Sequence, residues 1–369
     1  MKIVIDATNI RSGGGIKHLI GIHKYIKEFQ SLNFDIYLSD KLSEINFTDY
    51  KNCNLIFPWW AKSRSSIRFI FHLIFFYLKL KKFKPDFVIY PGSIIPFTCK
   101  NFNSVCISLN VLPFYENKSS FSLKSKFQKY LYIFSYKNSD LVIFSTIFSK
   151  KLIESHTGKI KNSFVMPSPF ESSSQKIKTL IFKKYKKNQF FKLVYVSPIF
   201  SYKNQIIILE AIELLSSEFK NYFSIDFIGG GSDNYFKSFT SKLNKLKKNG
   251  FKVNYLGEMN YGDLIYKLTN YNASLFASSC EALPFTIFEI HENDIPLLIS
   301  DVSPMKDFFD NQIIKFDPLS QASVKSALLK LFSKDIYSYN LSEYGSSLLN
   351  TTWKSYLSTL IDNLNKLKN

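Results

Sequence analysis

The sequence predicts an α/β fold with two parallel-sheet domains. Its 369 residues are too many for one comfortable hydrophobic core, so two domains of ordinary size are expected. Short apolar runs alternate with helical patterns in both halves of the chain, which is typical of parallel sheets covered by helices on both faces. Each half also opens with a strand that leads into a special loop, SGGG at 12–15 and SPIFSYKN at 197–204.

The first half predicts one parallel sheet. Its seven strand-like runs are residues 2–7, 35–39, 54–58, 86–92, 104–110, 140–145 and 163–168. Helical patterns separate them at 16–29, 67–80 and 125–138.

The alternation stops at a Ser- and Lys-rich stretch, which we interpret as a linker at 173–190, and then restarts. The second set of strand-like runs is 192–197, 224–230, 253–257, 273–278, 296–300 and 312–316. The expected domains are therefore 1–172 and 191–351, with a final helix at about 352–369 that packs back on the first domain. Ligands of such sheets bind at the carboxyl ends of the strands, so two facing sheets would form sites in the cleft between them.

The net charge of +19, from 48 Lys and Arg against 29 Asp and Glu, admits nucleic acid, an acidic small molecule or an anionic membrane as partner. A general residue bias rich in Lys, Asn, Ile and Phe would give the same excess. The basic residues are scattered and form no recognisable reader motif, which argues against nucleic acid.

The four cysteines indicate a reducing compartment. Cys53, Cys99, Cys106 and Cys280 lie far apart without a C-x-x-C pair, so neither a zinc ribbon nor a disulfide framework is expected. The opening run MKIVIDATNI contains Asp6 where a signal peptide would have an unbroken apolar core. We therefore expect a cytoplasmic protein.

Residues 67–80 form the longest apolar run, which is well short of the roughly 20 residues that a spanning helix needs. No acidic residue occurs between Tyr50 and Pro85. Cations and aromatic residues accompany the run: Trp59, Trp60, Lys62, Arg64, Arg68, Lys79, Lys81, Lys82 and Lys84. Two interpretations stay open: a core-packing helix with a basic end, or a peripheral helix on an anionic leaflet, where each cation near the surface contributes about 1 kcal/mol.

Glycine loops and one lysine follow three of the expected strands. The first loop lies between the first strand and the first helix, so bare backbone N–H groups could face an anion there, although a permissive turn explains it equally. Its residues are Gly13, Gly14 and Gly15. Gly229 and Gly230 close the run 224–230, and Lys203 precedes a helix that begins near Asn204, where a cation could meet a diphosphate.

Two carboxylates, Glu281 and Glu289, are separated by seven apolar or small residues. The segment TIFE at 286–289 matches a capping box, which would explain Glu289 without a ligand. Glu281 follows an apolar strand directly and is poorly placed for solvation, so it is a candidate ligand-binding group.

The sequence contains no D-x-D pair, no H-E-x-x-H, no G-x-S-x-G and no spaced Cys/His set. We therefore expect no metal and no cofactor. If a diphosphate leaves during a reaction, lysine and protein dipoles must neutralise it.

These motifs together resemble the family-4 retaining glycosyltransferases of the GT-B fold. The segments are LVYVSPIFSYKN, FIGGGSD, the E-x7-E pair Glu281 and Glu289, and PLLISDVSPMKD. In the first half, IDATNIRSGGGIKHL, DFVIYPGS and SLNVLPF resemble the branch that builds bacterial O-antigen, capsule and other surface polysaccharides. The likeness covers nearly the whole chain.

The resemblance implies roles for individual residues. Glu281 would hold hydroxyls of the donor sugar, Glu289 the ribose hydroxyls and Lys203 the diphosphate. Asn110 and His18 would lie on the acceptor side, with Asn110 taking part in catalysis beside Glu281 and Lys203. The further implied donor-binding positions are Gly13, Gly14, Gly15, Gly229, Gly230, Glu258, Met259, Leu283, Pro284 and Phe285.

The chain also departs from the family pattern. Ser197 and Pro198 stand where many relatives carry Gly-Arg, so the second phosphate cation is missing. Leu109, followed by Asn110, stands where many carry a histidine, and Pro284 is one of two positions where glycine is usual. These changes put a catalytic histidine in doubt.

The expected function is transfer of a sugar, with retention and without a metal, from a nucleotide sugar to a lipid-linked or growing glycan. Such an enzyme would work in the cytoplasm, with peripheral attachment to the inner membrane face as an open option. Three alternatives remain: a sugar-nucleotide 2-epimerase, a non-catalytic nucleotide-sugar-binding subunit, and a nucleic-acid binder.

Overall fold

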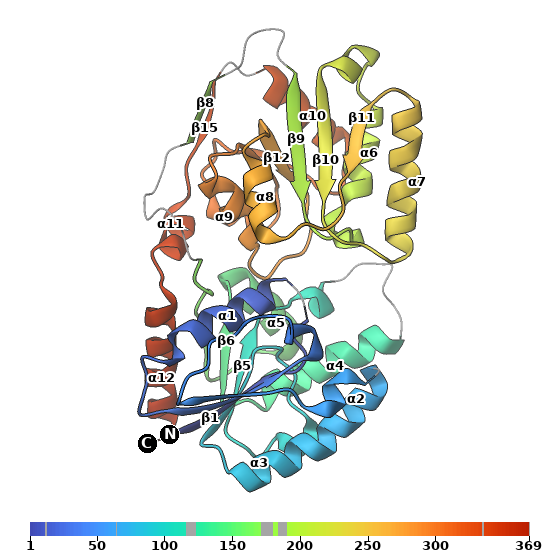
Figure 1. Ribbon diagram of the computed structural model, residues 1–369. Helices are drawn as coiled ribbons and strands as arrows, with labels where there is room; N and C mark the ends of the chain where they lie inside the picture. Colours follow the sequence, from blue (N-terminus) through green and yellow to red (C-terminus); the bar gives the residue numbers. More distant parts are fainter. Residues whose placement is uncertain are drawn as a thin grey trace. The chain divides into compact units, whose positions relative to one another are not determined.

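A computed structural model describes residues 1–11, 13–63, 65–115, 123–170, 180–183, 190–333 and 336–368. The chain folds into two compact units (Figure 1). Unit 1 comprises Met1–Glu171 and Asn350–Asn369, and unit 2 comprises Ser172–Leu349. The chain therefore starts and finishes in the same unit.

Unit 1 is built on a parallel sheet with the strand order β3-β2-β1-β4-β5-β6-β7. These strands are β1 (Lys2–Ala7), β2 (Asn33–Leu38), β3 (Cys53–Ile56), β4 (Phe87–Tyr90), β5 (Ser104–Ser108), β6 (Leu141–Phe144) and β7 (Ser163–Val165). Its helices are α1 (Gly14–Ile26), α2 (Ser65–Phe71), the π-helix η3 (His72–Phe76), α3 (Tyr77–Phe83), α4 (Leu123–Lys137), α5 (Ile147–Thr157) and α12 (Trp353–Lys368). Short 3₁₀ turns are η1 (Asp40–Leu42), η2 (Trp59–Lys62), η4 (Phe97–Cys99) and η5 (Leu112–Phe114).

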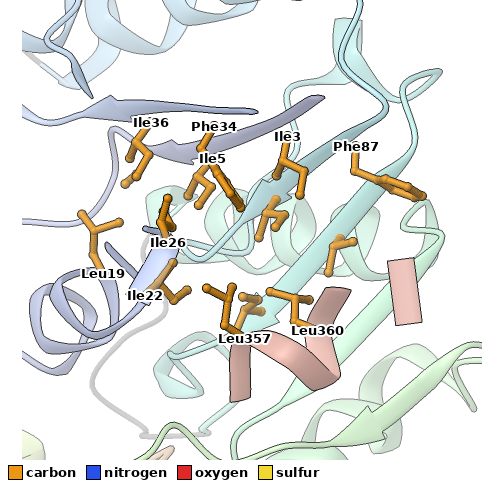
Figure 2. Close-up of a cluster of buried hydrophobic side chains, with 14 of the residues drawn as sticks. Ile3, Ile5, Leu19, Ile22, Ile26, Phe34, Ile36, Phe87, Leu357 and Leu360 are labelled. Carbon is orange, nitrogen blue, oxygen red and sulfur yellow. The ribbon is translucent and has the colours of Figure 1, made fainter. Parts of the chain in front are cut away.

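The core of unit 1 joins the first and last parts of the chain. Figure 2 shows isoleucines of β1 and α1 packed against leucines of α12, all of them buried. The two helices approach so closely at Gly21 that an added Cβ would lie 2.0 Å from the Trp353 indole. Glycine is therefore required in the middle of α1, and α12 is an integral part of this core.

Unit 2 is built on a second parallel sheet with the order β11-β10-β9-β12-β13-β14. These strands are β9 (Phe191–Val196), β10 (Phe223–Ile228), β11 (Lys252–Tyr255), β12 (Ala273–Phe276), β13 (Leu297–Ser300) and β14 (Ile314–Phe316). Its helices are α6 (Gln205–Glu213), α7 (Asn234–Lys248), α8 (Tyr261–Leu268), α9 (Phe285–Glu292), α10 (Gln321–Ser333) and α11 (Glu343–Leu349), with 3₁₀ turns η6 (Ser201–Lys203), η7 (Ser217–Asn221) and η8 (Met305–Phe308).

Local chemistry explains where several of these helices begin. The Asp233 carboxylate accepts the backbone N–H of Phe236 at 2.9 Å at the start of α7, and the Asn260 side chain accepts that of Asp263 at 2.9 Å at the start of α8. Thr146 and Ser149 form a reciprocal capping box before α5. Small polar side chains thus close the first turn of each of these helices.

The predicted α/β class is confirmed, and each expected strand is present in one of the two parallel sheets. The expected helix at 67–80 contains a π-helical segment, which sequence patterning does not reveal. The expected linker at 173–190 contains the short strand β8 (Leu180–Lys183). It pairs antiparallel with β15 (Ile336–Tyr339), which is distant in sequence. Residues 171–179 and 184–189 of that stretch lie outside the described residues.

Candidate functional site

The strand order of unit 2 marks one edge of its sheet as a ligand site. The order reverses between β9 and β12, so the connections that leave these two neighbouring strands run to opposite faces. In open parallel sheets, ligands bind outside the carboxyl ends of the strands at such a point. The loops that follow β9 and β12 are therefore the candidate site.

Lys203 from the β9 loop and Glu281 from the β12 loop meet at this point. The Lys203 ammonium donates to the Glu281 carboxylate, and both side chains are largely buried. The same ammonium lies 5.1 Å from the ring centre of Tyr202 and 5.3 Å from that of Phe276. The Tyr195 hydroxyl donates to the Lys203 carbonyl at 2.6 Å, which fixes the backbone. The result is a held ion pair at the edge of the sheet.

Asn204 and Ser279 fasten the two loops together. Asn204 ends η6 in the left-handed conformation with φ 56°, and its side-chain amide donates to the Ala277 carbonyl at 2.8 Å. The Ser279 backbone N–H donates to the Tyr202 carbonyl at 2.8 Å. These bonds join residues about 75 positions apart in sequence, so the ion pair rests on a rigid support.

Cys280 lies next to Glu281 but offers no thiolate. Burial, together with the negative charge of Glu281, raises the pKa of its thiol to about 12 despite the opposing effect of Lys203. The thiol stays protonated at neutral pH.

The loops after β9, β10 and β11 contact one another mainly through backbone atoms at glycines. A Cβ on Gly229 would lie 2.1 Å from the Ser197 carbonyl oxygen, and its φ of 147° is one that other residues rarely adopt. A Cβ on Gly230 would lie 2.9 Å from a carboxylate oxygen of Glu258. The Gly229 N–H donates to the Gly257 carbonyl at 2.9 Å. Gly229 is therefore structurally required, whereas Gly230 meets only the end of the exposed Glu258 side chain, which lies at the neighbouring loop.

Met259 follows Glu258 before α8 begins. Met259 is half-buried and Glu258 is exposed. Both residues belong to the same carboxyl edge of the sheet as Lys203 and Glu281, since each follows the end of a parallel strand.

Glu289 is the fifth residue of α9 and is buried. The helix begins at Phe285 with Pro284 as its N-cap, so Thr286 lies inside the first turn. The capping-box interpretation of TIFE is therefore wrong, because a proline and not the threonine occupies the cap.

The turn before α9 contains Leu283, Pro284 and Phe285. Phe285 donates its backbone N–H to the Leu283 carbonyl at 3.1 Å, so this amide already has an acceptor. Pro284 has no N–H to offer. Neither Pro284 nor Phe285 therefore presents an unengaged backbone amide to a ligand in this turn.

The glycine loop of unit 1 occupies the corresponding place in its own sheet, after β1 and beside the β1/β4 reversal. Gly13 has φ 64° and caps α1 without a side-chain hydrogen bond, and the first turn of α1 carries no acidic residue. Gly13 and Gly14 are exposed, whereas an added Cβ on Gly15 would lie 3.2 Å from the Ile10 side chain. Backbone N–H groups at this helix start suit an anion.

His18 is not on an accessible surface, contrary to the expectation for an acceptor-side residue. Its ring is completely buried, with Nδ1 2.7 Å from the Ser168 hydroxyl and T-shaped contacts to Trp353 and Tyr356. Burial lowers the pKa of His18 to about 3, so the ring is neutral at pH 7. The correction follows from α12, which covers this face of α1.

Asn110 is half-buried just beyond the end of β5. Its side-chain oxygen accepts the Leu112 N–H at 3.0 Å, and its amide donates to the Tyr132 hydroxyl at 3.3 Å. The residue is held in a fixed orientation by both contacts.

Sequence reasoning missed a buried polar group at the end of β1. Asp6 accepts from the Thr8 hydroxyl at 2.7 Å and lies 2.8 Å from His72 Nε2, while the Trp60 indole N–H donates to His72 Nδ1 at 3.3 Å. Burial raises the pKa of Asp6, but contacts with His72 and Thr8 outweigh it and leave the pKa below its usual value. An aspartate inside an apolar strand was the available signal.

Within the described part of the chain, no group of three or more His, Cys, Asp or Glu side chains is arranged to hold a metal ion. The helices described there include none that is long and apolar enough to cross a membrane. A hollow of about 640 Å³ lies near the start of β9, away from the residues above, and is lined by Phe219, Tyr222, Ser326, Leu329, Lys330, Phe332 and Ser333.

Comparison with solved structures identifies the fold. The chain resembles the apo lipopolysaccharide outer core galactosyltransferase WaaB with a TM-score of 0.64 and 16% identity, covering 98% of this chain and 99% of that one. Sucrose-phosphate synthase from Thermosynechococcus elongatus gives a TM-score of 0.73 at 11% identity over 100% and 99% of the two chains. Anabaena HepE in complex with UDP and glucose gives 0.65 at 13% identity over 100% and 97%. The fold is GT-B.

A family model matches part of the sequence. Residues 176–347, slightly less than half of the chain, match the model of the glycosyl transferases group 1 family. The matched residues lie within unit 2.

Two curated relatives agree with this family. The capsular polysaccharide biosynthesis glycosyltransferase CapH of Staphylococcus aureus is 28% identical over 211 residues, which is 56% of this chain and 52% of the relative. An uncharacterized glycosyltransferase of Methanocaldococcus jannaschii is 26% identical over 247 residues, 60% of this chain and 57% of the relative. The matched region spans little more than half the length of these relatives.

Proposed function

We propose that this chain is a retaining, metal-independent glycosyltransferase. It would move a sugar from a nucleotide-sugar donor to a lipid-linked or growing glycan acceptor during synthesis of a bacterial surface polysaccharide. The observation that carries the proposal is the Lys203–Glu281 pair at the carboxyl edge of β9 and β12, inside the region that matches the model of the glycosyl transferases group 1 family. The similarity to a capsular glycosyltransferase supports the pathway class.

The pair supplies the two chemical functions that a nucleotide sugar needs. A carboxylate accepts hydrogen bonds from sugar hydroxyls, and an ammonium neutralises a diphosphate. Without donor, Lys203 and Glu281 neutralise one another. We expect the donor diphosphate to take over Lys203 while the sugar hydroxyls donate to Glu281, so that each desolvated charge keeps a partner.

The other donor contacts follow from position. Glu289, buried on α9, would accept from the ribose hydroxyls, and Glu258 with Met259 would border the base. The tight glycine turn at Gly229 and Gly230 would let the nucleotide approach the backbone. Gly13, Gly14 and Gly15 would direct backbone N–H groups of α1 at a phosphate or at the acceptor.

In the proposed reaction the bond between the anomeric carbon and the phosphate oxygen breaks, and its electron pair stays on the phosphate. The acceptor hydroxyl oxygen bonds to the same face of the anomeric carbon, and its proton passes to the departing phosphate. Lys203 stabilises the negative charge that develops there. No covalent sugar–enzyme bond is needed. Asn110, fixed by Leu112 and Tyr132, would orient the acceptor hydroxyl.

The proposed setting is the cytoplasmic face of the inner membrane, where a lipid-linked acceptor would be available. The partners are a nucleotide sugar and that acceptor, and the proposal includes neither a cofactor nor nucleic acid.

The test begins with the donor. A panel of nucleotide sugars is added to the full chain and the melting temperature is measured, because a ligand at 100 times its Kd adds about 2.7 kcal/mol to stability. The stabilising donor is then incubated with lipid-linked acceptors, and transfer and anomeric configuration are followed by mass spectrometry and NMR.

Other outcomes of these assays would identify other functions. Free epimerised nucleotide sugar formed without acceptor would mean a 2-epimerase. Donor binding without turnover on any acceptor would mean a binding subunit, and an inverted product would overturn the retaining mechanism.

A further inference from the structure

A row of exposed aliphatic side chains runs along the continuous helical element α2–η3–α3. The exposed fractions are 46% for Ile67, 54% for Ile70, 50% for Ile74 and 53% for Leu78. Their spacing of three, four and four residues places them on one face. We call these four residues the apolar row. Large aliphatic residues left half-exposed in sequence along a helix indicate a surface that meets something else.

The opposite face of the same element already supplies its contacts with the core. Phe76 and Leu80 are completely buried, and His72 is buried against Asp6. The helix therefore has two apolar faces, and only one of them packs on unit 1. Core packing alone does not account for the apolar row.

Neighbouring elements extend this surface. Trp59 on η2 is 55% exposed and contacts Phe71 and Phe75, with ring centres 5.0 and 5.2 Å away. On α4, Phe127 and Tyr130 are also at least half exposed. The ring contact between Phe69 and Phe127 places α4 beside α2 (Figure 1).

Cations accompany these apolar groups. Exposed lysines near these groups include Lys62, Lys79, Lys81, Lys82, Lys84 and Lys126. No acidic residue occurs from position 51 to 84. The apolar row, the aromatic residues Trp59, Phe127 and Tyr130, and these six lysines together form what we call the docking face.

We propose that the docking face rests on an anionic lipid bilayer. Aliphatic side chains at a helix surface suit the acyl boundary, Trp and Tyr suit the headgroup level, and flanking lysines suit anionic headgroups while their stems lie along the apolar surface. Protein interfaces are depleted in lysine, and nucleic acid offers no partner for a row of isoleucine and leucine, so the composition favours lipid over both.

The attachment would also fix unit 1 relative to the lipid surface. The His72–Asp6 contact joins the docking helix to the end of β1, and the glycine loop follows shortly after. A bilayer-bound chain would hold that loop at a fixed height above the lipid surface, where a lipid-linked acceptor would meet it. This consequence rests on the proposed function, whereas bilayer binding itself does not.

The first test removes three of the four side chains of the apolar row. The full chain is sedimented with vesicles of phosphatidylcholine containing about 30% phosphatidylglycerol, at low salt and without nucleotide. A triple variant, Ile70→Ser, Ile74→Ser and Leu78→Ser, is expected to bind at least about tenfold more weakly than wild type. The matched control places serine at three exposed leucines of unit 2, Leu214, Leu319 and Leu329, and is expected to bind within about twofold of wild type.

The second test removes the cations. Replacing Lys79, Lys81, Lys82 and Lys84 by Gln is expected to weaken binding about fivefold per lysine, so more than about 100-fold in total, because each cation contributes about 1 kcal/mol near an anionic surface. The control replaces the exposed Lys237, Lys245, Lys247 and Lys248 of α7 by Gln and is expected to cost less than about threefold. Equal losses in both variants would mean general attraction by net charge and would overturn the docking face.

The third test reports contact directly. The chain has three tryptophans, of which Trp60 and Trp353 are buried and Trp59 is exposed. Anionic vesicles should therefore shift the fluorescence emission to the blue, and Trp59→Phe should remove the shift while leaving most of the binding. Binding without a Trp59 signal would contradict the proposal.

Other occupants give distinct results. A wild-type chain that dimerises without vesicles, and a row variant that is monomeric, would assign the face to a second copy of the chain. Equal binding to neutral and anionic vesicles would also overturn the proposal of an anionic bilayer. Because no donor or acceptor is present, these results are independent of whether the transfer assay succeeds.

Discussion

The two sheets share the β3-β2-β1-β4 type of strand order, but the loops at the point where that order reverses carry different groups. In unit 2 the loops there carry a charged pair, Lys203 and Glu281, held by side-chain hydrogen bonds. In unit 1 the loop after β1 presents exposed glycines, and the charged group, Asp6, is buried beneath it. The same topology thus offers charged side chains in one unit and bare backbone in the other. The predictions below test that contrast, from the largest expected effect to the smallest.

Replacing Glu281 by Gln should separate a functional pair from a structural one. Loss of the charge should lower kcat/KM by about 100- to 1,000-fold, because the sugar hydroxyls would lose their proposed charged acceptor in the transition state. The matched control, Glu213→Gln, also removes a lysine contact, but at a more exposed site, and should leave turnover unchanged. Wild-type turnover in Glu281→Gln would remove this residue from the mechanism.

Lowering the pH should lower the stability of the chain, because His18 of unit 1 is buried in its neutral form. The pKa of His18 is about 3 in the folded chain, below its ordinary value of about 6.5, so the unfolded state binds the extra proton between these values. Stability is therefore fully present above about pH 6.5 and falls at about 1.4 kcal/mol per pH unit as the pH drops toward 3. Urea unfolding from about pH 7 to pH 4 measures the slope.

The variant His18→Asn has no group that titrates at this position and should flatten the slope in that range, whatever its offset in stability at pH 7. Parallel curves for His18→Asn and wild type would show that another group is responsible.

Alanine at the two glycine loops should have unequal costs. A methyl at Gly229 would overlap the Ser197 carbonyl oxygen in addition to the unusual φ, so Gly229→Ala should destabilise unit 2 by about 3 kcal/mol. At Gly13 no atom lies within 4 Å of an added Cβ, so Gly13→Ala should cost only the strain of the backbone conformation at φ 64° and ψ −144°, about 1 to 2 kcal/mol. Thermal unfolding of both variants provides the comparison, and equal shifts would show that φ alone decides.

Asn204 separates backbone conformation from side-chain bonding at the charged site. Asn204→Gly keeps the left-handed backbone and loses the bond to the Ala277 carbonyl, which should cost about 1 kcal/mol. Asn204→Ala should cost about 1 kcal/mol more, because alanine adopts that backbone poorly. If Asn204→Gly were as stable as wild type, the hydrogen bond from Asn204 to the Ala277 carbonyl would contribute nothing measurable to stability.

Patterns within a short stretch of sequence were enough to find the elements and several candidate residues. Alternating apolar runs located the strands of both sheets. Lys203 and Glu281 were each proposed separately from their place after a strand. That they contact one another follows from the reversal of strand order between β9 and β12, which depends on how distant strands pair.

The misread positions all involve partners far away in the chain or a competing local residue. His18 was expected on a surface because the covering helix α12 lies more than 300 residues later. The strand β8 pairs with a segment about 150 residues away, so the local sequence pattern indicates a linker and not a strand. At TIFE, the helix begins at Phe285 with Pro284 at the cap, one residue before Thr286, so the expected capping box does not form.

The contact between Gly21 and Trp353 bears on how the chain is made. Unit 1 cannot complete its interior until α12 has left the ribosome, whereas every strand of the large sheet of unit 2 has emerged earlier. During translation the second unit can therefore close first, while the earlier-synthesised half waits with an uncovered apolar face. An apolar face that stays uncovered during synthesis is prone to association with other chains.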